Sequence, residues 1–444
     1  MFVKFGMLKK VCSFFKARAF VKCFAFAVLF ACGFSNNCLA TDRAILDSLV
    51  EKGILTQTEA SEIAKSMVSQ VSVLRPTTQA IALSLRSQFQ GEWVNSSAKS
   101  GANAPQEESD IGIVARRVYI QVDSDVGAGW KARFSADIAG SKLYSFLNDN
   151  YLAKDFDGEY LNGNLTIGHM KPGMCVESMK SSFSLNAIER SAVTRYWTVS
   201  ANGTLLGIGD RYVGVRWLGN VKQVKGLSYN LALTNAFHLN PHKADALDYN
   251  FKNNSPAYWF GLHYELERET AKIKFGVYSM YSESANQNMG LTDSSSVYTI
   301  NPYYTGNWGK LYFWGDFITS GVADGKKVGA STVQANPYGI NFSLEYRFDI
   351  QDYGELAPTF RYSWLDTGGR GVAISDIQRH ATNFGNLYNN AQDFYIGLNW
   401  YLRGDDLKVQ LGFSYIQYSG SPDNKHSGDF AESSALRTQF QIKF

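Results

Sequence analysis

The sequence is poor in cysteine and proline and has no long apolar run. Five cysteines and nine prolines occur in 444 residues, and four of the cysteines (Cys12, Cys23, Cys32, Cys38) fall within the first 40 positions. Cys175 alone stands in the remaining chain, which excludes an intrachain disulfide scaffold and a cysteine-based metal site there. No stretch of 18 apolar residues occurs, which excludes a helical membrane span of ordinary length.

The first 40 residues have the composition of an export signal. Basic residues come first, the apolar run CFAFAVLFACGF (23–34) follows, and Cys38-Leu39-Ala40 offers small residues, Cys38 and Ala40, at the positions that a signal peptidase reads. We expect residues 1–40 to be a signal peptide cleaved near Ala40, with a lipoprotein signal around Cys32 as the alternative. Cleavage removes six positive charges and no acid, so the formal net charge changes from +3 to −3. This balance gives no indication of nucleic-acid binding.

Residues 41–76 differ from the rest of the chain because their apolar residues have helical spacing. Thr56-Gln57-Thr58-Glu59 has the pattern of a capping box and leads into a second apolar run that ends before Pro76. We expect two short helices facing the periplasm. They are either an appendage packed on itself or a small coiled coil that joins subunits.

From residue 77 onward, apolar and polar residues alternate with a period of two, which predicts β-strands with two different faces. Aromatic residues make up 14% of the chain. Many stand near the ends of the apolar face of a strand, as in the aromatic girdles of lipid-facing barrels. We count about sixteen such segments, near residues 78–94, 112–126, 129–140, 153–161, 164–171, 205–218, 226–236, 256–267, 270–281, 297–305, 308–319, 337–349, 354–364, 392–402, 406–418 and 433–444.

This rhythm predicts an all-β fold: a transmembrane antiparallel β-barrel of about 16 strands over residues 77–444. A barrel of that size leaves an aqueous channel, whereas eight strands would fill with side chains. The last strand alternates from Leu436 to Phe444 and is expected to close the barrel against the first. We therefore expect the protein in the outer membrane of a Gram-negative cell, in contact with outer-membrane lipid.

Residues 172–204 form the longest stretch of the first half without clear alternation. They are either an external loop or a loop folded into the channel to narrow it. Charges on the lumenal parity favour cations, twelve against seven, which predicts a weak anion preference unless they merely keep the lumen wet. These are Arg86, Arg117, Lys131, Arg133, Arg216, Lys272, Lys274, Arg347, Arg361, Lys408, Arg437 and Lys443 against Asp123, Asp137, Glu265, Glu267, Asp316, Glu345 and Asp349.

Three stretches resemble the phosphate-selective porin O and P family: ARRVYIQVDSDVGAGWKARFSAD (115–137), GNLTIGHMKPGMCVE (163–177) and KSSFSLNAIERS (180–191). The resemblance implies a sixteen-stranded homotrimeric barrel whose narrow zone passes anions along Arg, Lys and loop hydroxyl groups. It also implies that the barrel-assembly machinery recognises the C-terminal Phe444. Ser178 stands where phosphate-specific members carry lysine, and Lys180 is the nearest substitute.

The resemblance assigns Arg86, Arg116, Arg117, Ser181, Ser182 and Arg190 to that narrow zone. Strand parity places Arg86, Arg117, Tyr119, Lys131 and Arg133 on the lumenal face, and Lys180 completes the candidates. Arg116 falls on the lipid parity, so it needs a bulge or a place at the rim.

We therefore predict a water-filled channel for passive diffusion of small hydrophilic solutes, weakly selective for anions, with phosphate or similar oxyanions as candidate solutes. One alternative is a general, non-selective diffusion porin. Another is a structural or adhesive barrel tethered through residues 42–74. An enzyme built around His263 is disfavoured because no motif of a nucleophile with a base is visible. No cofactor, metal or nucleic-acid partner is predicted.

Overall fold

The structure, a computed structural model, describes residues 80–100, 104–139, 147–199, 204–235, 256–283, 295–422 and 429–444. The predicted signal peptide (1–40) and helical segment (41–76) lie outside the described residues and stay predictions. Contacts divide the chain into two compact units, residues 1–83 with 122–128, and residues 84–121 with 129–444, and the lumen described below belongs to the second unit. Within the described ranges, no helix has the length and apolarity needed to cross a membrane.

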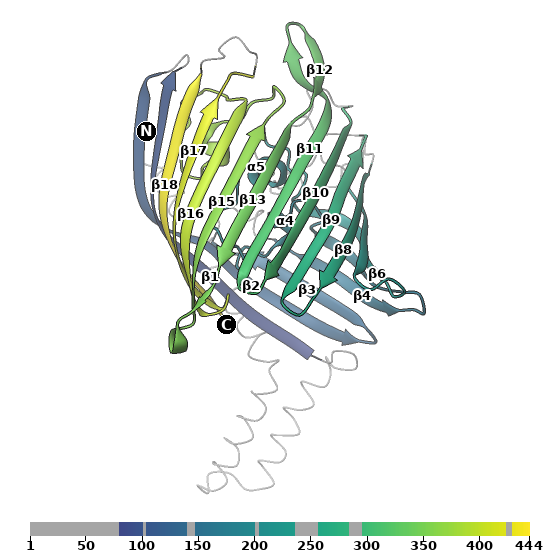
Figure 1. The fold of residues 1–444 in the computed structure, drawn as a ribbon. Coiled ribbons are helices and arrows are strands. Elements are labelled where there is room, and N and C mark those ends of the chain that lie inside the picture. Colours follow the sequence, from purple (N-terminus) through teal and green to yellow (C-terminus); the bar gives the residue numbers. More distant parts are fainter. Residues whose placement is uncertain are drawn as a thin grey trace, which may run out of the picture. The chain divides into compact units, whose positions relative to one another are not determined.

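Sixteen antiparallel strands of the described chain form one closed barrel (Figure 1), as the alternation predicted. They are β1 (Ala80–Ser100), β2 (Gln106–Gly127), β3 (Trp130–Asp137), β4 (Asn150–Asp157), β5 (Leu161–Met170), β6 (Tyr212–Val221), β7 (Leu227–Thr234), β8 (Ala257–Glu267), β9 (Ala271–Ser282), β10 (Val297–Trp308), β11 (Leu311–Val328), β13 (Tyr338–Tyr346), β15 (Glu355–Asp366), β16 (Asn390–Arg403), β17 (Leu407–Ser419) and β18 (Phe430–Lys443). Two short strands, β12 (Ser331–Ala335) and β14 (Phe348–Asp349), extend the ladders of β11 and β15.

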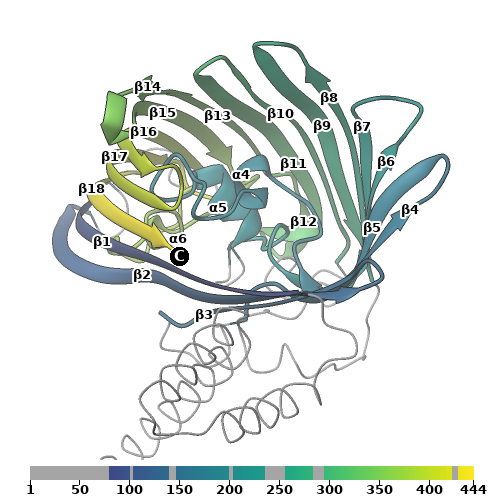
Figure 2. The ribbon, with the colours of Figure 1, turned by 90° about the horizontal axis from the view of Figure 1, so that it is seen from below.

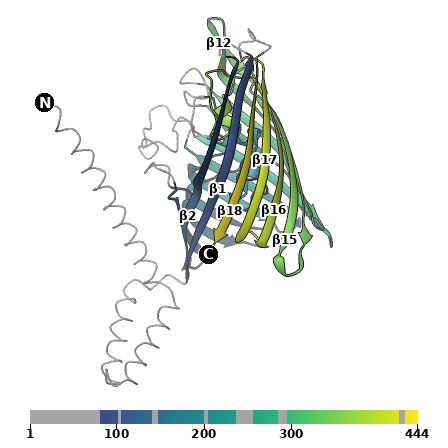
Figure 3. The ribbon, with the colours of Figure 1, turned by 90° about the vertical axis from the view of Figure 1, so that its left-hand side faces the viewer.

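The barrel closes where β1 pairs with β18 (Figure 3), in a register that runs from Arg86 opposite Lys443 to Ser100 opposite Phe430. The backbone groups of Leu85 and Phe444 complete this seam with two hydrogen bonds, of 2.8 and 3.0 Å. The last strand therefore closes the barrel against the first, as predicted. Closure leaves no free sheet edge at this seam.

The two faces of each strand meet different surroundings. On β8, Tyr258, Phe260 and Leu262 are exposed on the outside, whereas Trp259 and His263 are buried on the inside. Apolar side chains that point away from the lumen on neighbouring strands make a surface suited to lipid. The predicted strand 205–218 begins only at position 212, because the residues before it fold into the lumen.

Two connections fold into the barrel (Figure 2). We call residues 171–211, between β5 and β6, the inward loop; its described part carries α4 (Val176–Met179) and α5 (Ala192–Thr198). We call residues 367–389, between β15 and β16, the second inward loop; it carries α6 (Ile374–Ile377). A 3₁₀ turn, η2 (Gln351–Tyr353), follows β14. The described sequence thus places two loops, rather than one, where they can narrow the channel.

Candidate functional site

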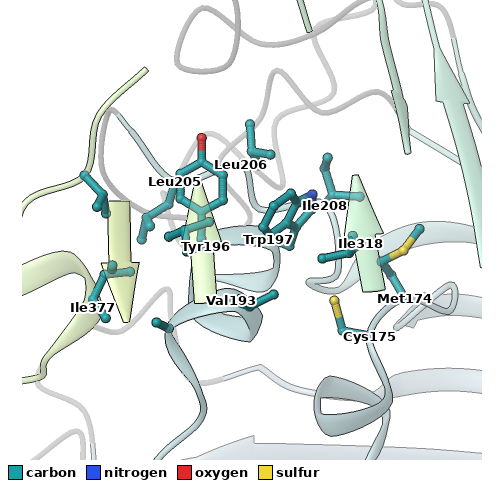
Figure 4. Close-up of a cluster of buried hydrophobic side chains, with 14 of the residues drawn as sticks. Met174, Cys175, Val193, Tyr196, Trp197, Leu205, Leu206, Ile208, Ile318 and Ile377 are labelled. Carbon is teal, nitrogen blue, oxygen red and sulfur yellow. The ribbon is translucent and has the colours of Figure 1, made fainter. Parts of the chain in front are cut away.

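An apolar cluster holds the inward loop against one side of the barrel (Figure 4). Tyr196 and Trp197 of α5 are fully buried, together with Ile318 of β11 and Ile377 of α6. The indole Nε1 of Trp197 donates a hydrogen bond to the hydroxyl of Ser320 at 2.8 Å. Burial of large aromatic side chains with their polar atom satisfied is strongly stabilising, so this cluster fixes the position of α5.

A buried ion network ties both helices of the inward loop to the wall. Arg361 of β15 is 2% exposed and donates to Glu177 Oε1 at 3.0 Å, to the Glu189 carbonyl at 2.6 Å and to Asp393 Oδ2 at 3.0 Å. Glu177 Oε2 also accepts the backbone N–H of Ser191, the N-cap of α5, at 2.9 Å. Since removing one partner of such a network leaves buried charge unpaired, Arg361 anchors the loop.

Polar side chains of the barrel wall donate hydrogen bonds to the backbone of the inward loop between α4 and α5. The Lys408 ammonium donates to the carbonyls of Phe183 and Leu185, both at 3.0 Å, and Gln441 donates to Phe183 at 2.9 Å. Gln88 of β1 donates to the Ser182 carbonyl at 3.1 Å. Arg361 and Lys408 were counted as lumenal cations from strand parity, but the loop covers both. Parity alone therefore overstates the charge that faces water.

A cavity of about 430 Å³ lies on the other side of the inward loop, between it and the wall residues of β1, β2 and β3. Eight basic and three acidic residues line it. These are Arg86, Arg116, Arg117, Arg133, Lys171, Lys180, Arg190 and Arg211, with Asp137, Asp149 and Asp210.

The structure brings nine of the ten residues predicted for the narrow zone to this cavity. Hydroxyl groups of Tyr119, Ser181 and Ser182 stand among the basic side chains. Lys131 is the exception, because it lies near the start of β3 and pairs with the exposed Asp155 at 2.6 Å. The cavity thus joins strand and loop residues that are about 100 positions apart in sequence.

Arg116 and Arg117 both face the cavity, although consecutive strand residues normally point to opposite faces. Ile111 and Ile113 point outward, 86% and 88% exposed, so Arg117 would follow their parity in a regular strand. Arg117 is instead 4% exposed and donates to Gln88 at 2.7 Å. The alternation of inward and outward side chains on β2 therefore shifts by one residue between Ile113 and Arg117. Such an irregularity is what the sequence required for Arg116 to face the lumen.

Each acidic residue of the cavity is engaged with a neighbour. Asp149 accepts from Arg211 Nε at 2.7 Å, and Asp137 Oδ1 accepts the backbone N–H groups of Val118 and Ala139. Asp210 accepts the backbone N–H of Arg211 at 2.8 Å. Their charge is therefore directed partly at the protein, and the lining as a whole carries a formal excess of positive charge, eight basic against three acidic residues.

Sequence reasoning missed two basic residues at the cavity, Lys171 and Arg211. Lys171 follows β5 and donates to the Ser178 carbonyl, and burial, then Arg190 and Arg211, hold its pKa well below the usual lysine range. Arg211 precedes β6 and was placed inside a predicted strand. The stretch 163–177, which resembles the porin family and contains Lys171, could have indicated the first, but nothing in the alternation indicated the second.

His263, the residue considered for an enzyme, lies in an aromatic cluster of the wall. Its Nδ1 is 2.9 Å from the Tyr303 hydroxyl, and its ring meets that of Tyr278 edge-on. The side chain is 5% exposed. These contacts account for the histidine as a packed wall residue.

Residues 98–306 match the sequence model of the family described as phosphate-selective porin O and P. The match covers slightly less than half of the chain and bears out its resemblance to this porin family. With its closed barrel, the porin is an outer-membrane channel. No curated protein matches the chain.

Solved structures similar to this porin include a Salmonella typhi OmpF complex with daunomycin, at 12% identity and TM-score 0.49 over 82% of this chain and 97% of that one. A high-pH structure of Pseudomonas putida OprB is 10% identical, with TM-score 0.49 over 86% and 96% of the two chains. In-vitro folded OmpT of Vibrio cholerae, in its trimer form, is 11% identical, with TM-score 0.42 over 82% and 100%. The strand pairing of this chain itself establishes its barrel fold.

Proposed function

We propose that this porin passes small anions through the cavity between the inward loop and strands β1 to β3. The observation that carries the proposal is the charge of the lining, eight basic residues against three acidic ones that are already engaged. Rings of basic side chains set the selectivity of anion pores. The water-filled passage makes the preference weak, because exposed charges are screened at physiological salt.

Phosphate or a similar oxyanion is the proposed class of preferred solute. Guanidinium groups offer forked hydrogen bonds to oxyanions, and the hydroxyl groups of Tyr119, Ser181 and Ser182 can replace part of the hydration shell. Ser178, in the position where phosphate-specific members carry lysine, is buried and lies 3.3 Å from the Lys171 ammonium. Lys171 and Lys180 supply the positive charge on this side of the cavity.

The reversal potential across a planar bilayer under a KCl gradient tests the anion preference. We expect a chloride preference in the natural protein and a weaker one after Arg190→Ala, because Arg190 lines the cavity and its buried Nε has no hydrogen-bond partner. Lys310→Ala is the matched control, since Lys310 pairs with Asp349 away from the cavity. A potassium preference in the natural protein would show a general diffusion porin or a cation-selective channel instead.

The anion preference is expected to fall as the pH rises through a range below the one in which lysine ordinarily titrates. The pKa of Lys171 is lowered by burial and by Arg190 and Arg211, so this ammonium loses its proton earlier than usual. Each lost proton removes a positive charge from the lining. Reversal potentials measured over this range should change less in Lys171→Met, and an identical pH dependence in both proteins would contradict the assignment.

We also propose a homotrimer and recognition of Phe444 by the assembly machinery, both implied by the family resemblance. Phe444 is 67% exposed at the end of the seam, which leaves its ring accessible. Chemical crosslinking in membranes should capture three copies. Deletion of Phe444 should lower the amount of assembled barrel while leaving synthesis unchanged.

A further inference from the structure

Glu189 of the inward loop does not line the cavity but holds an arginine that does. Its Oε1 accepts from Arg116 Nε at 2.6 Å, and its Oε2 accepts from Arg116 Nη2 at 3.0 Å. Arg117 Nη2 lies 4.0 Å from the same Oε2. A forked contact fixes the plane of a guanidinium group, so Glu189 determines where Arg116 points.

The second inward loop brings another arginine to the same carboxylate. Arg379 Nη1 lies 3.5 Å from Glu189 Oε1, and Arg379 Nη2 lies 3.6 Å from Glu92 Oε1 of β1. Glu92 also accepts from Arg437 of β18 at 3.0 Å. His380 of the second loop contacts Glu92 as well.

Four arginines in this group share two carboxylates. The group joins β1, β2, β18 and both inward loops, and two of its arginines face the cavity. An excess of positive charge therefore stands beside the channel. We call the group of Glu92, Arg116, Arg117, Glu189, Arg379 and Arg437 the arginine cluster.

We infer that Glu189 is a positioning residue that sets the strength of anion preference, and that Arg379 makes the second inward loop part of the selectivity filter. The inference rests on the proposed function. Glu189 orients Arg116 and cancels part of the positive charge of the cluster, whereas Arg379 adds to that charge without lining the cavity. The negative charge of Glu189 on the inward loop then lowers the anion preference, and the positive charge of Arg379 on the second inward loop raises it.

Two substitutions test the inference. Each has a control that removes a charge of the same sign elsewhere in the protein. Glu189→Gln is expected to raise the chloride-to-potassium permeability ratio about twofold, and Arg379→Gln to lower it about twofold. One unit charge at roughly 8 Å in a water-like dielectric, screened at physiological salt, changes the Boltzmann factor of each ion by about 1.4 in opposite directions, and the ratio by the square of that factor, about twofold. The matched controls are Asp349→Asn and Lys310→Gln, an exposed pair away from the cavity.

Glu189→Asp separates charge from position. It keeps the carboxylate but shortens its reach, so the permeability ratio in KCl should stay near that of the natural protein. Inorganic phosphate should then block chloride current only at a several-fold higher concentration, because Arg116 is no longer held. An unchanged block would overturn the positioning role and leave the charge effect.

The outcomes distinguish this inference from the proposed function. Chloride preference in the natural protein, with both variants matching their controls, would overturn the inference alone. Potassium preference in the natural protein would overturn the proposed function, while opposite shifts in the two variants would still support the cluster. Folding is checked by the mobility of the unheated barrel on a gel, and Arg379→Gln decides the matter if Glu189→Gln does not fold.

Discussion

Replacing Arg361 by alanine is expected to raise the single-channel conductance several-fold and to remove the anion preference. Arg361 is the one cation in contact with Glu177, Asp393 and the Glu189 carbonyl in the described structure. Its loss leaves two buried carboxylates without that partner, and breaking a buried pair costs about 3 to 5 kcal/mol. The inward loop then leaves the wall, and the wide lumen of the barrel replaces the cavity as the path of ions.

Single-channel recording in a planar bilayer measures this effect. Arg347→Ala is the matched control, because Arg347 also pairs with two carboxylates, and both Glu345 and Glu355 belong to wall strands, β13 and β15. The control should keep the conductance of the natural channel within its scatter. Equal conductance in Arg361→Ala and the natural protein would show that the apolar cluster alone holds the loop.

Replacing Trp197 by alanine is expected to expose the inward loop to trypsin while the barrel stays folded. Trp197 is completely buried, and truncation of a buried tryptophan costs about 3 to 5 kcal/mol through lost burial and the cavity left behind. The substitution lowers the free energy of local opening of the inward loop by this amount. The hydrogen bonds between the barrel strands do not depend on Trp197, so the barrel stays folded. Cleavage is expected after Lys180, Arg190 or Arg195.

Limited proteolysis of protein in detergent, followed by mass spectrometry, locates the cut. Trp308→Ala is the control, since Trp308 is 68% exposed at the end of β10 and touches no part of the cluster around α5. Trp197→Phe keeps most of the packing and should protect the loop. Resistance of Trp197→Ala to trypsin would mean that the ion network suffices to hold α5.

The strands could be predicted from the sequence because their signal is local. Each strand that faces lipid on one side and water on the other carries a period of two, and each of the sixteen predicted segments has a matching strand. The exceptions are instructive. The predicted strand 205–218 starts too early, because Leu205 and Leu206 are buried in the loop cluster and β6 begins at Tyr212.

The cavity could be predicted only in part, because alternation tells which residues face the lumen but not what covers them. Arg361 and Lys408 face inward as expected, yet the inward loop covers both and accepts their hydrogen bonds. Arg379 was missed because it comes from a second loop, whose inward fold depends on contacts with Glu92 and Glu189 that lie far away in sequence. Such pairings carry no local pattern.

The seam between β1 and β18 gives the cavity a place in the order of assembly. One wall comes from the first strands of the barrel, and the loop opposite is anchored on β15, β17 and β18, near the end of the chain. The two sides face each other only when the first and last strands have paired. The proposed selectivity is therefore expected to arise only on closure, and a barrel whose first and last strands are unpaired would lack the complete cavity.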